Sequence, residues 1–394
     1  MKKRSVSTGP ADITVPSRDN NRDLVLEVLR RNQPISRVAI ARRSGLQRST
    51  ISSIVERLLD EGWVREGSVV KTARGRRPTM LSMNDDLVIL VADVRPTRAI
   101  LAIVDLNGRF LSRAVVPLIS DPTLGVKAIA EGMLKLRGQF PDKTCEGVGL
   151  SLPGRVDRKT QKMVFAPNLP WVGFDIRAAL QKRLQLQVEL ENAANACMLS
   201  EAWFGRLDGV RNAVLITISE GVGAAALVNG GLMEGAAGLA GEVGHIPISE
   251  TGPKCSCGQV GCWETFASSR AALRYFHESS PDQTVPTMEQ LMNMEASGNE
   301  KAKRAMEEQA RAIGRGLRIV TAAFNPEIIL FAGDITLRWE LMGRIIEQEL
   351  RKVILTGDPP KIVALNDGES ARLLGAAALV LQRHTGYQRQ SPAR

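Results

Sequence analysis

Residues 241–264 read GEVGHIPISETGPKCSCGQVGCWE, a stretch that concentrates cysteine, histidine and glycine. It holds three of the chain's five cysteines and one of its three histidines: His245, Cys255, Cys257 and Cys262. Three thiolates and one imidazole complete the tetrahedral shell that structural zinc prefers, and glycines permit the tight turns that bring them together. Because a reducing cytosol disfavours disulfides, we predict structural Zn²⁺ here rather than disulfides or free thiols. Four protein ligands close the shell, so the ion is expected to hold a loop rather than to activate water.

The length and composition around this stretch are those of a globular protein. At roughly 150 residues per domain, 394 residues allow two or three domains. Hydrophobic residues at 44% and charged residues at 24% exclude a disordered, collagenous or membrane-spanning chain. No apolar run approaches the roughly 18 residues that cross a bilayer, and the basic residues 1–4 are not followed by a hydrophobic signal segment. We therefore expect a cytoplasmic protein without membrane insertion, in which Cys145 and Cys197 are ordinary core residues.

The positive charge is concentrated at the N-terminal end. Residues 1–84 carry 17 Lys and Arg against 8 Asp and Glu, which is +9 of the total net charge of +10. This asymmetry indicates a nucleic-acid-binding module joined to a neutral body. A solvated basic arm is the alternative that composition leaves open.

Three closely spaced helices are predicted within the basic segment. Apolar residues recur at helical spacing over residues 22–31, and Pro34 then breaks the helix. Ser36 suits the N-cap of a second, short helix, and Gly45 suits its C-terminal end. A third helix, residues 47–60, has its own apolar stripe. This order is typical of a helix-turn-helix.

The polar face of the third helix supplies candidate DNA contacts. Its N-terminal half exposes short donors and acceptors and one guanidinium: Gln47, Arg48, Ser49, Thr50, Ser52 and Ser53. Such side chains suit base edges and phosphates when a recognition helix enters the major groove of an operator. A solvated face on a small helical bundle is the alternative.

A wing is predicted after the helices. Residues 63–65 and 68–70 are expected to form two strands of a hairpin, and residues 79–83 a further strand. Between them lies a basic segment with a glycine and a proline, whose cations are Lys71, Arg74, Arg76 and Arg77; the three arginines are the candidate DNA contacts. An extended arm of this kind can insert arginines into a narrow minor groove, although a charged linker would have the same composition.

Beyond residue 85 the pattern alternates between apolar strands and helices, which favours α/β architecture. The expected helices are residues 124–140 and 301–324, and the expected strands are residues 87–93, 99–105, 147–152, 188–190, 213–219, 224–228 and 328–332. Fully apolar strands imply sheets that are covered on both faces.

Several motifs of this body resemble the ROK family of repressors and sugar kinases. They lie at residues 152–157, 166–169, 191–195, 241–245, 255–264 and 324–327, so the resemblance covers residues 85–384. It implies a two-lobed, actin-like body of the sugar-kinase type, and a winged helix-turn-helix before such a body is the layout of the repressor branch. The expected division is a flexible basic arm (1–21), a winged helix-turn-helix (22–84), a body (85–384) with lobes 85–190 plus 370–384 and 191–369, and a tail (385–394).

The resemblance also implies a sugar in the cleft between the lobes. The family's sugar contacts correspond to Asn192, Glu242, His245 and Glu264, with Gly154, Arg155 and Asn168 as further candidates. Carboxylates and amides bind neighbouring hydroxyls, and a zinc-fixed loop would hold Glu242 and Glu264 in place. The alternative role of these two carboxylates is to orient zinc ligands.

Three departures from the family pattern argue against phosphotransfer. Ala193 stands where the kinases place an aspartate as general base, whose loss costs on the order of 10² to 10⁴ in rate. The phosphate-binding turn Asp-Ile-Gly-Gly-Thr is replaced by residues 93–97, DVRPT, and the late Gly-Gly-Gly by residues 332–334, AGD. The added side chains occupy space where a backbone should approach phosphate.

These features together predict a transcriptional regulator, a repressor of carbohydrate-utilisation genes, that uses a catalytically inactive cleft to sense a sugar. A palindromic operator calls for a homodimer, with a tetramer left open. Two alternatives remain open: control by docking of a sugar-transport protein, and an active ROK sugar kinase that carries a DNA-binding arm.

Overall fold

The computed structural model describes residues 18–69, 78–157, 160, 162–166, 169–205, 207, 209–233, 235, 238–352 and 358–384. The chain divides into an N-terminal unit, which comprises Met1–Asp85 together with Leu381–Arg394, and a body, Asp86–Val380. No helix in the described ranges combines the length and apolarity needed to span a bilayer.

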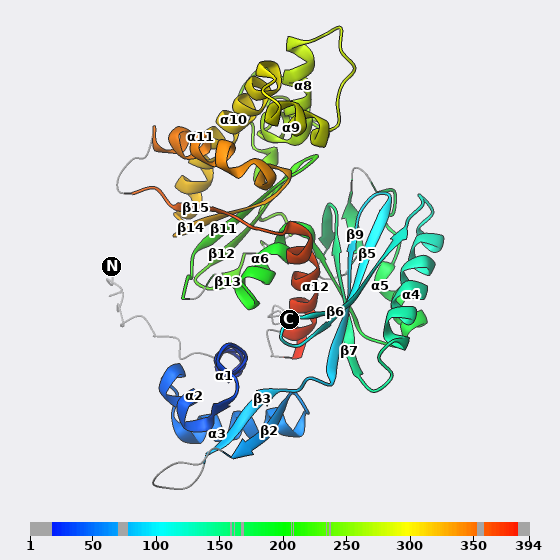
Figure 1. Cartoon of the computed structure of the whole chain (residues 1–394), viewed down its shortest axis with the longest axis vertical. Helices are drawn as coiled ribbons and strands as arrows, with labels where there is room; N and C mark the ends of the chain where they lie inside the picture. Colours follow the sequence, from blue (N-terminus) through cyan, green and yellow to red (C-terminus); the bar gives the residue numbers. More distant parts are fainter. Residues whose placement is uncertain are drawn as a thin grey trace, which may run out of the picture. The chain divides into compact units, whose positions relative to one another are not determined.

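The N-terminal unit contains three helices and a small sheet whose strand order is β1-β3-β2. Its elements are α1 (Arg18–Asn32), β1 (Ile35–Ser36), α2 (Arg37–Ser44), α3 (Arg48–Asp60), β2 (Val64–Val69) and β3 (Thr79–Met83) (Figure 1). The Ser36 side chain caps α2 by accepting the Ala39 N–H, and Gly45 adopts a left-handed conformation with φ of 71° after the helix. The three predicted helices and both caps are thus confirmed.

The predicted hairpin of residues 63–65 and 68–70 is wrong. Residues on both sides of Gly67 belong to the single strand β2, which pairs antiparallel with β3 through a register shift between Glu66 and Val69. Leu81 of β3 is fully buried in the core of the unit, and the pairing of β2 with β3 explains why the chain does not turn back at Gly67. Arg74, Arg76 and Arg77 lie outside the described residues, as do most of the predicted basic arm and the whole tail.

The body contains two five-stranded sheets (Figure 1). The first has the order β10-β7-β4-β5-β6, with β4 antiparallel to β5 and parallel to β7, and β7 parallel to β10. Its strands are β4 (Leu87–Val94), β5 (Arg98–Asp105), β6 (Phe110–Pro117), β7 (Thr144–Leu152) and β10 (Val188–Asn192). The second has the order β13-β12-β11-β14-β15, with strands β11 (Ala213–Ile218), β12 (Val222–Val228), β13 (Gly231–Leu232), β14 (Ile328–Gly333) and β15 (Lys361–Ala364). Every strand predicted for the body is present.

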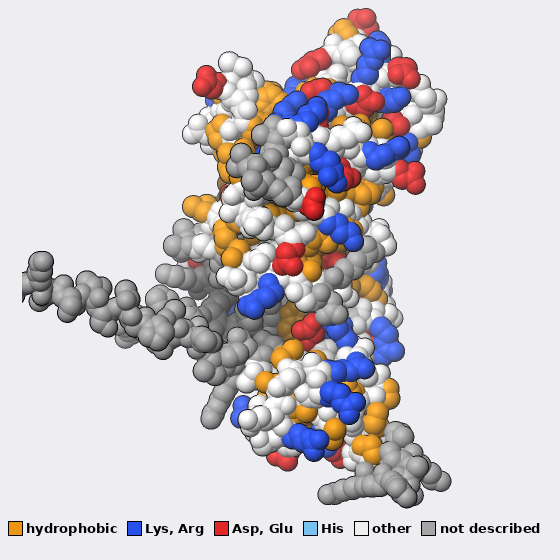
Figure 2. Space-filling view, turned by 90° about the vertical axis from the view of Figure 1, so that its left-hand side faces the viewer, with side chains coloured by type: hydrophobic (Ala, Val, Ile, Leu, Met, Phe, Trp, Pro, Cys, Tyr) orange, Lys and Arg blue, Asp and Glu red, His pale blue; other side chains and the backbone are white. Residues whose placement is uncertain are grey.

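Helices cover these sheets. They are α4 (Pro122–Gly138), α5 (Ile176–Leu184), α6 (Ala193–Trp203), α7 (Glu264–Ala267), α8 (Ser269–Ser279), α9 (Met288–Ala296), α10 (Glu300–Phe324), α11 (Trp339–Arg351) and α12 (Gly368–His384). A short strand pair, β8 (Arg155–Asp157) and β9 (Lys162–Phe165), follows β7, and the 3-10 helices η1 (Glu242–His245) and η2 (Asp334–Arg338) complete the chain. Acidic and basic side chains are interspersed over the part that holds α8–α11 (Figure 2).

Helix α12 packs closely against β7 and α6. A Cβ atom on Gly149 of β7 would lie 1.9 Å from the Ala376 carbonyl oxygen, and one on Gly375 of α12 would lie 1.8 Å from the Ala196 carbonyl oxygen. Both positions therefore require glycine, and together they allow the middle of α12 to lie directly against β7 and α6.

The carboxyl ends of three parallel strands of the first sheet carry a row of buried polar residues. Asp93 of β4 pairs in register with Ser151 of β7, which in turn pairs with Glu191 of β10. All three are at most 1% exposed. Polar residues at this edge mark the place where ligands bind in open parallel sheets.

Candidate functional site

The four predicted metal ligands converge in the described structure. The ligand atoms of His245, Cys255, Cys257 and Cys262 all lie within 4.8 Å of one another. Cys255 Sγ is 3.4 Å from His245 Nδ1, and Cys257 Sγ is 3.6 Å from Cys262 Sγ. Zinc–sulfur bonds of about 2.3 Å and zinc–nitrogen bonds of about 2.0 Å place tetrahedral ligands roughly 3.5–3.8 Å apart. The donor set and its spacing thus fit a metal ion of the size and preference of zinc.

Local backbone structure brings these ligands together. His245 ends the 3-10 helix η1, and isolated bridges pair Pro247 with Cys262 and Lys254 with Val260. Gly261 has φ of +74°, and a Cβ there would lie 1.9 Å from the Ser249 carbonyl oxygen. Only glycine allows the two segments to approach this closely immediately before Cys262.

Two carboxylates contact the metal-ligand cluster from the cleft. Glu242 Oε2 lies 3.7 Å from His245 Nε2, the ring nitrogen opposite the one that faces Cys255. Glu264 Oε1 lies 3.8 Å from Cys255 Sγ, and its Oε2 accepts the Val222 N–H at 3.0 Å. Carboxylates in these positions can orient metal ligands. Both also line the cleft, so the same side chains are placed to contact a sugar as well.

The cleft has a volume of about 740 Å³, within the usual range for small-molecule sites. Of the predicted sugar contacts, the residues that line it are Gly154, Asn192, Glu242, His245 and Glu264. Arg155 is not among its described lining residues, and Asn168 lies outside the described residues. Residues that the sequence did not single out as sugar contacts also line it, notably Ser219, Ser256 and Asp367.

Asn192 and Ala193 lie where the first sheet meets α6. The Asn192 side chain caps α6 by accepting the Asn195 N–H at 2.9 Å, and the Glu191 carboxylate accepts hydrogen bonds from the Asn192 backbone and the Asn195 side chain. Ala193, the first residue of α6, presents only a methyl group to the cleft. A methyl group can neither accept a proton nor hydrogen-bond to a hydroxyl.

An ion-pair chain also lines the cleft. Arg95 Nε donates to Asp93 Oδ2 at 2.8 Å, and its NH2 group lies 3.2 Å from Glu369 Oε2 in the first turn of α12. Arg372 also approaches Asp93 Oδ2, at 3.7 Å. The sequence analysis noted that Arg95 replaces a glycine of the family's phosphate-binding turn. Its pairing with Glu369 could not be predicted, because the two residues are 274 positions apart in the sequence.

In the N-terminal unit, the predicted DNA contacts lie at the start of α3. Gln47, Arg48, Ser49 and Ser53 are exposed, whereas Thr50 and Ser52 are half-buried. Gln47 is the N-cap residue, but its side chain makes no capping hydrogen bond. The side chains of Gln47 and Arg48 have no partner within the described residues and are available to a ligand.

Two further cations lie beside this face. Arg42 and Arg43 are exposed in the last turn of α2, immediately before Gly45 and the start of α3. Neither makes an ion pair with any described residue. The sequence analysis did not single them out, although two adjacent arginines at the end of the helix before a recognition helix were a readable signal.

Comparisons with known proteins follow this division of the chain. The sequence profile of the ROK family matches residues 92–383, and that of a winged helix-turn-helix DNA-binding domain matches residues 18–65. The xylose repressor of Bacillus subtilis strain 168 is 30% identical over 384 residues, which cover 94% of this chain and 97% of that protein.

Two solved structures resemble the fold. A ROK family transcriptional regulator described as a homolog of the E. coli MLC protein has a TM-score of 0.78 and 25% identity, and covers 93% of this chain and 99% of its own. A ROK family glucokinase from Streptomyces griseus, in complex with glucose and AMPPNP, has a TM-score of 0.66 and 29% identity, and covers 75% of this chain and 99% of its own.

Proposed function

The chain belongs to the ROK family and begins with a winged helix-turn-helix, and from this we propose that it is a transcriptional repressor of carbohydrate-utilisation genes that responds to a sugar. The resemblance drawn from the motifs is confirmed, as is the fold class of a winged helix-turn-helix followed by a two-lobed, actin-like α/β body. The observation that carries the proposal is the presence, in one chain, of an exposed recognition helix and a cleft lined with hydroxyl-binding side chains.

DNA binding is assigned to residues 22–84 and ligand binding to residues 85–384. Helix α3 would enter the major groove with Gln47 and Arg48 at base edges, while Arg42 and Arg43 contact phosphates. A homodimer with two such units would bind a palindromic operator with half-sites about one or two helical turns apart, in the cytoplasm where the operator DNA lies.

We assign the metal site to structural Zn²⁺. Three cysteines and one histidine match the ligands of closed zinc sites, and a closed shell leaves no position for a reactive water. The ion would fix the loop that carries Glu242 and Glu264. Ligand binding would then not have to order this loop, which favours affinity.

A sugar would bind against Asn192, Glu242, His245 and Glu264, whose oxygens and ring nitrogen face the cleft from three separate elements. Gly154 lies in the same wall, and Arg155 and Asn168 stay candidates from the resemblance. A ligand that binds one closure of the two lobes better than another shifts the population of DNA-competent dimers.

Phosphotransfer is not part of this proposal. Ala193 offers no general base, and the Arg95 guanidinium lies among the carboxylates where nucleotide phosphates would have to pass. Incubation with ATP, magnesium and a sugar panel is expected to yield no turnover above background.

The experiment that tests the proposal is selection of DNA fragments by the purified protein, with and without each sugar of a panel. A single palindromic sequence whose recovery depends on one sugar supports sugar control. Recovery of a palindrome that no sugar affects favours the second candidate, control by docking of a sugar-transport protein. Recovery of no common sequence contradicts the repressor proposal.

A further inference from the structure

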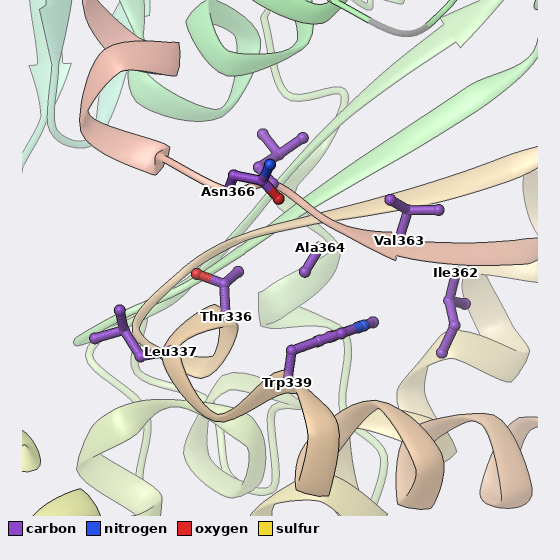
Figure 3. A pocket seen from close by; sticks show the side chains of 8 residues that line it. Thr336, Leu337, Trp339, Ile362, Val363, Ala364 and Asn366 are labelled. Carbon is purple, nitrogen blue, oxygen red and sulfur yellow. The ribbon is translucent and has the colours of Figure 1, made fainter.

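A second hollow adjoins the cleft at the edge of the second sheet. It has a volume of about 430 Å³ and lies between η2, the start of α11 and the edge strand β15. Its lining residues are Thr336, Leu337, Trp339, Ile362, Val363, Ala364, Leu365 and Asn366. Thr336, Leu337 and Asn366 also line the cleft, so the two cavities are adjacent. Figure 3 shows the Trp339 ring between Thr336 and Ile362.

Trp339 is firmly held on one side and open on the other. Its ring lies 5.1 Å from the Phe331 ring, at an interplanar angle of 41°, and a Cβ on Gly343 would lie 2.8 Å from it. The residue is nevertheless half-exposed, and its indole N–H has no acceptor within the described ranges. The hollow thus presents a fixed aromatic surface with an unused donor.

The rim of the hollow combines apolar and polar groups. Leu337 is 71% exposed, which is unusual for leucine, and Ile362 is half-exposed on the edge strand. Asn366 is exposed, and its amide makes no hydrogen bond with a described residue. The Thr336 hydroxyl donates to the Gly333 carbonyl at 2.9 Å and keeps its oxygen as an acceptor.

The charges between this hollow and the metal loop disfavour a phosphorylated ligand. Three arginines and seven carboxylates line the cleft, which is a formal charge of −4, and no lysine is among the described lining residues. The arginines pair with carboxylates of the same wall: Arg95 with Asp93 and Glu369, Arg372 with Asp93, and Arg270 with Glu220. The net charge of the lining would repel a phosphate group, whereas neutral hydroxyls find acceptors in carboxylates such as Asp334 and Asp367.

A pyranose ring matches this chemistry, because its C–H faces are apolar and its edges carry hydroxyls. We infer that the hollow is a second carbohydrate subsite, and that the effector is an uncharged oligosaccharide with one ring at Asn192 and Glu264 and a further ring stacked on Trp339. This inference rests on the proposed sugar control of the protein. It assigns Trp339 and Asn366 to specificity for chain length.

The test is calorimetric titration of the full-length protein with β-1,4-linked and α-1,4-linked sugar series of one to five rings. In one series we expect the affinity to rise by about tenfold at the length that reaches Trp339, and then to level off. Trp339→Leu and Asn366→Ala should remove this rise and leave the affinity for the monosaccharide unchanged.

Fluorescence supplies a second readout that does not depend on a destabilising substitution. Trp63, Trp171 and Trp263 are at most 2% exposed, so quenching by a long oligosaccharide should come from Trp339. Trp339→Phe should abolish the quenching while it retains most of the rise in affinity. Trp203→Phe, a change at the half-buried end of α6, is the matched control and should keep both.

The outcomes separate this inference from the proposed function. Binding of a monosaccharide with no gain for longer chains overturns the oligosaccharide subsite but leaves sugar control intact. Quenching of Trp339 by adenosine and not by any oligosaccharide also overturns it. If no member of either series binds, the inference is overturned, and sugar control is decided separately by the DNA selection with the full sugar panel.

Discussion

Glu264 Oε2 accepts a hydrogen bond from the Val222 backbone N–H at 3.0 Å, while its other oxygen lies 3.8 Å from Sγ of Cys255, a predicted metal ligand. One carboxylate thereby connects β12 of the second sheet to the metal loop at the edge of the cleft. The turn before β12 requires glycine for this contact, because a Cβ on Gly221 would lie 2.5 Å from Glu264 Oε2.

Glu264→Gln should weaken sugar binding by about tenfold to a hundredfold, because hydrogen bonds to charged groups contribute about 1.5–3 kcal/mol. The amide oxygen can still accept the Val222 N–H, so the loop should stay folded and retain one metal ion per chain. Calorimetry and metal analysis of the same sample measure both. Loss of the metal with unchanged sugar affinity would instead assign Glu264 to the zinc site alone, and the exposed Glu340→Gln on α11 is the control.

Removal of the metal should lower both the stability of the body and its affinity for sugar. Binding of an ion to the folded state alone, at 1,000 times its dissociation constant, stabilises that state by about 4 kcal/mol. We expect a strong chelator or Cys257→Ser to lower the melting temperature by several degrees. Added Zn²⁺ should restore the melting temperature of the chelated wild type but not that of the variant. A melting temperature and sugar affinity that chelation leaves unchanged would contradict a structural role for the ion.

The five thiols should react in two groups. Burial raises the pKa of Cys197 to about 12 and raises the pKa of Cys145 as well, so both remain protonated thiols at pH 8. The raised pKa favours the unreactive form, and solvent is excluded from both side chains. Of the three remaining thiols only Cys257 is exposed, so a colorimetric thiol assay at pH 8 should count about one rapidly reacting thiol in the folded, chelated protein and all five only after denaturation. Five reactive thiols in the folded, chelated protein would be inconsistent with this core.

Arginines of the N-terminal unit should differ in what they contribute to operator binding. Arg48→Ala should weaken binding and relax the preference at one base pair, by about 1–3 kcal/mol if the contact is a bidentate base contact. Arg76→Ala, in the segment outside the described residues, is expected to weaken binding through a lost minor-groove contact. Equal affinity of wild type and both variants in a mobility-shift titration would count against this docking geometry.

Arg43→Ala should act on all sequences alike. A lost phosphate contact reduces the slope of log K against log salt by about 1 without changing the preferred sequence. Arg304→Ala, an exposed arginine of α10, is the matched control and should leave the slope unchanged. A variant that changes base preference instead would place Arg43 at a base edge.

The sequence predicted the local structure well wherever the signal was local. The caps Ser36 and Gly45, the apolar strands and the cluster of His245 with three cysteines all follow from short stretches of chain. The prediction failed at Gly67, because a glycine between two short β-prone stretches suits a turn as well as a bulged strand, and only the pairing with β3 decides between them.

By itself, then, the sequence determined the main strands of the body, the cluster of one histidine and three cysteines, and the family, because each is encoded in residues that are close along the chain. Only the tertiary structure shows that Arg95 pairs with Glu369 and that Glu264 contacts both Val222 and Cys255. It also shows that Trp339 and Asn366 line the same cavity. These contacts join elements from different parts of the sequence, and the packing of sheets and helices, rather than any local pattern, sets their distances.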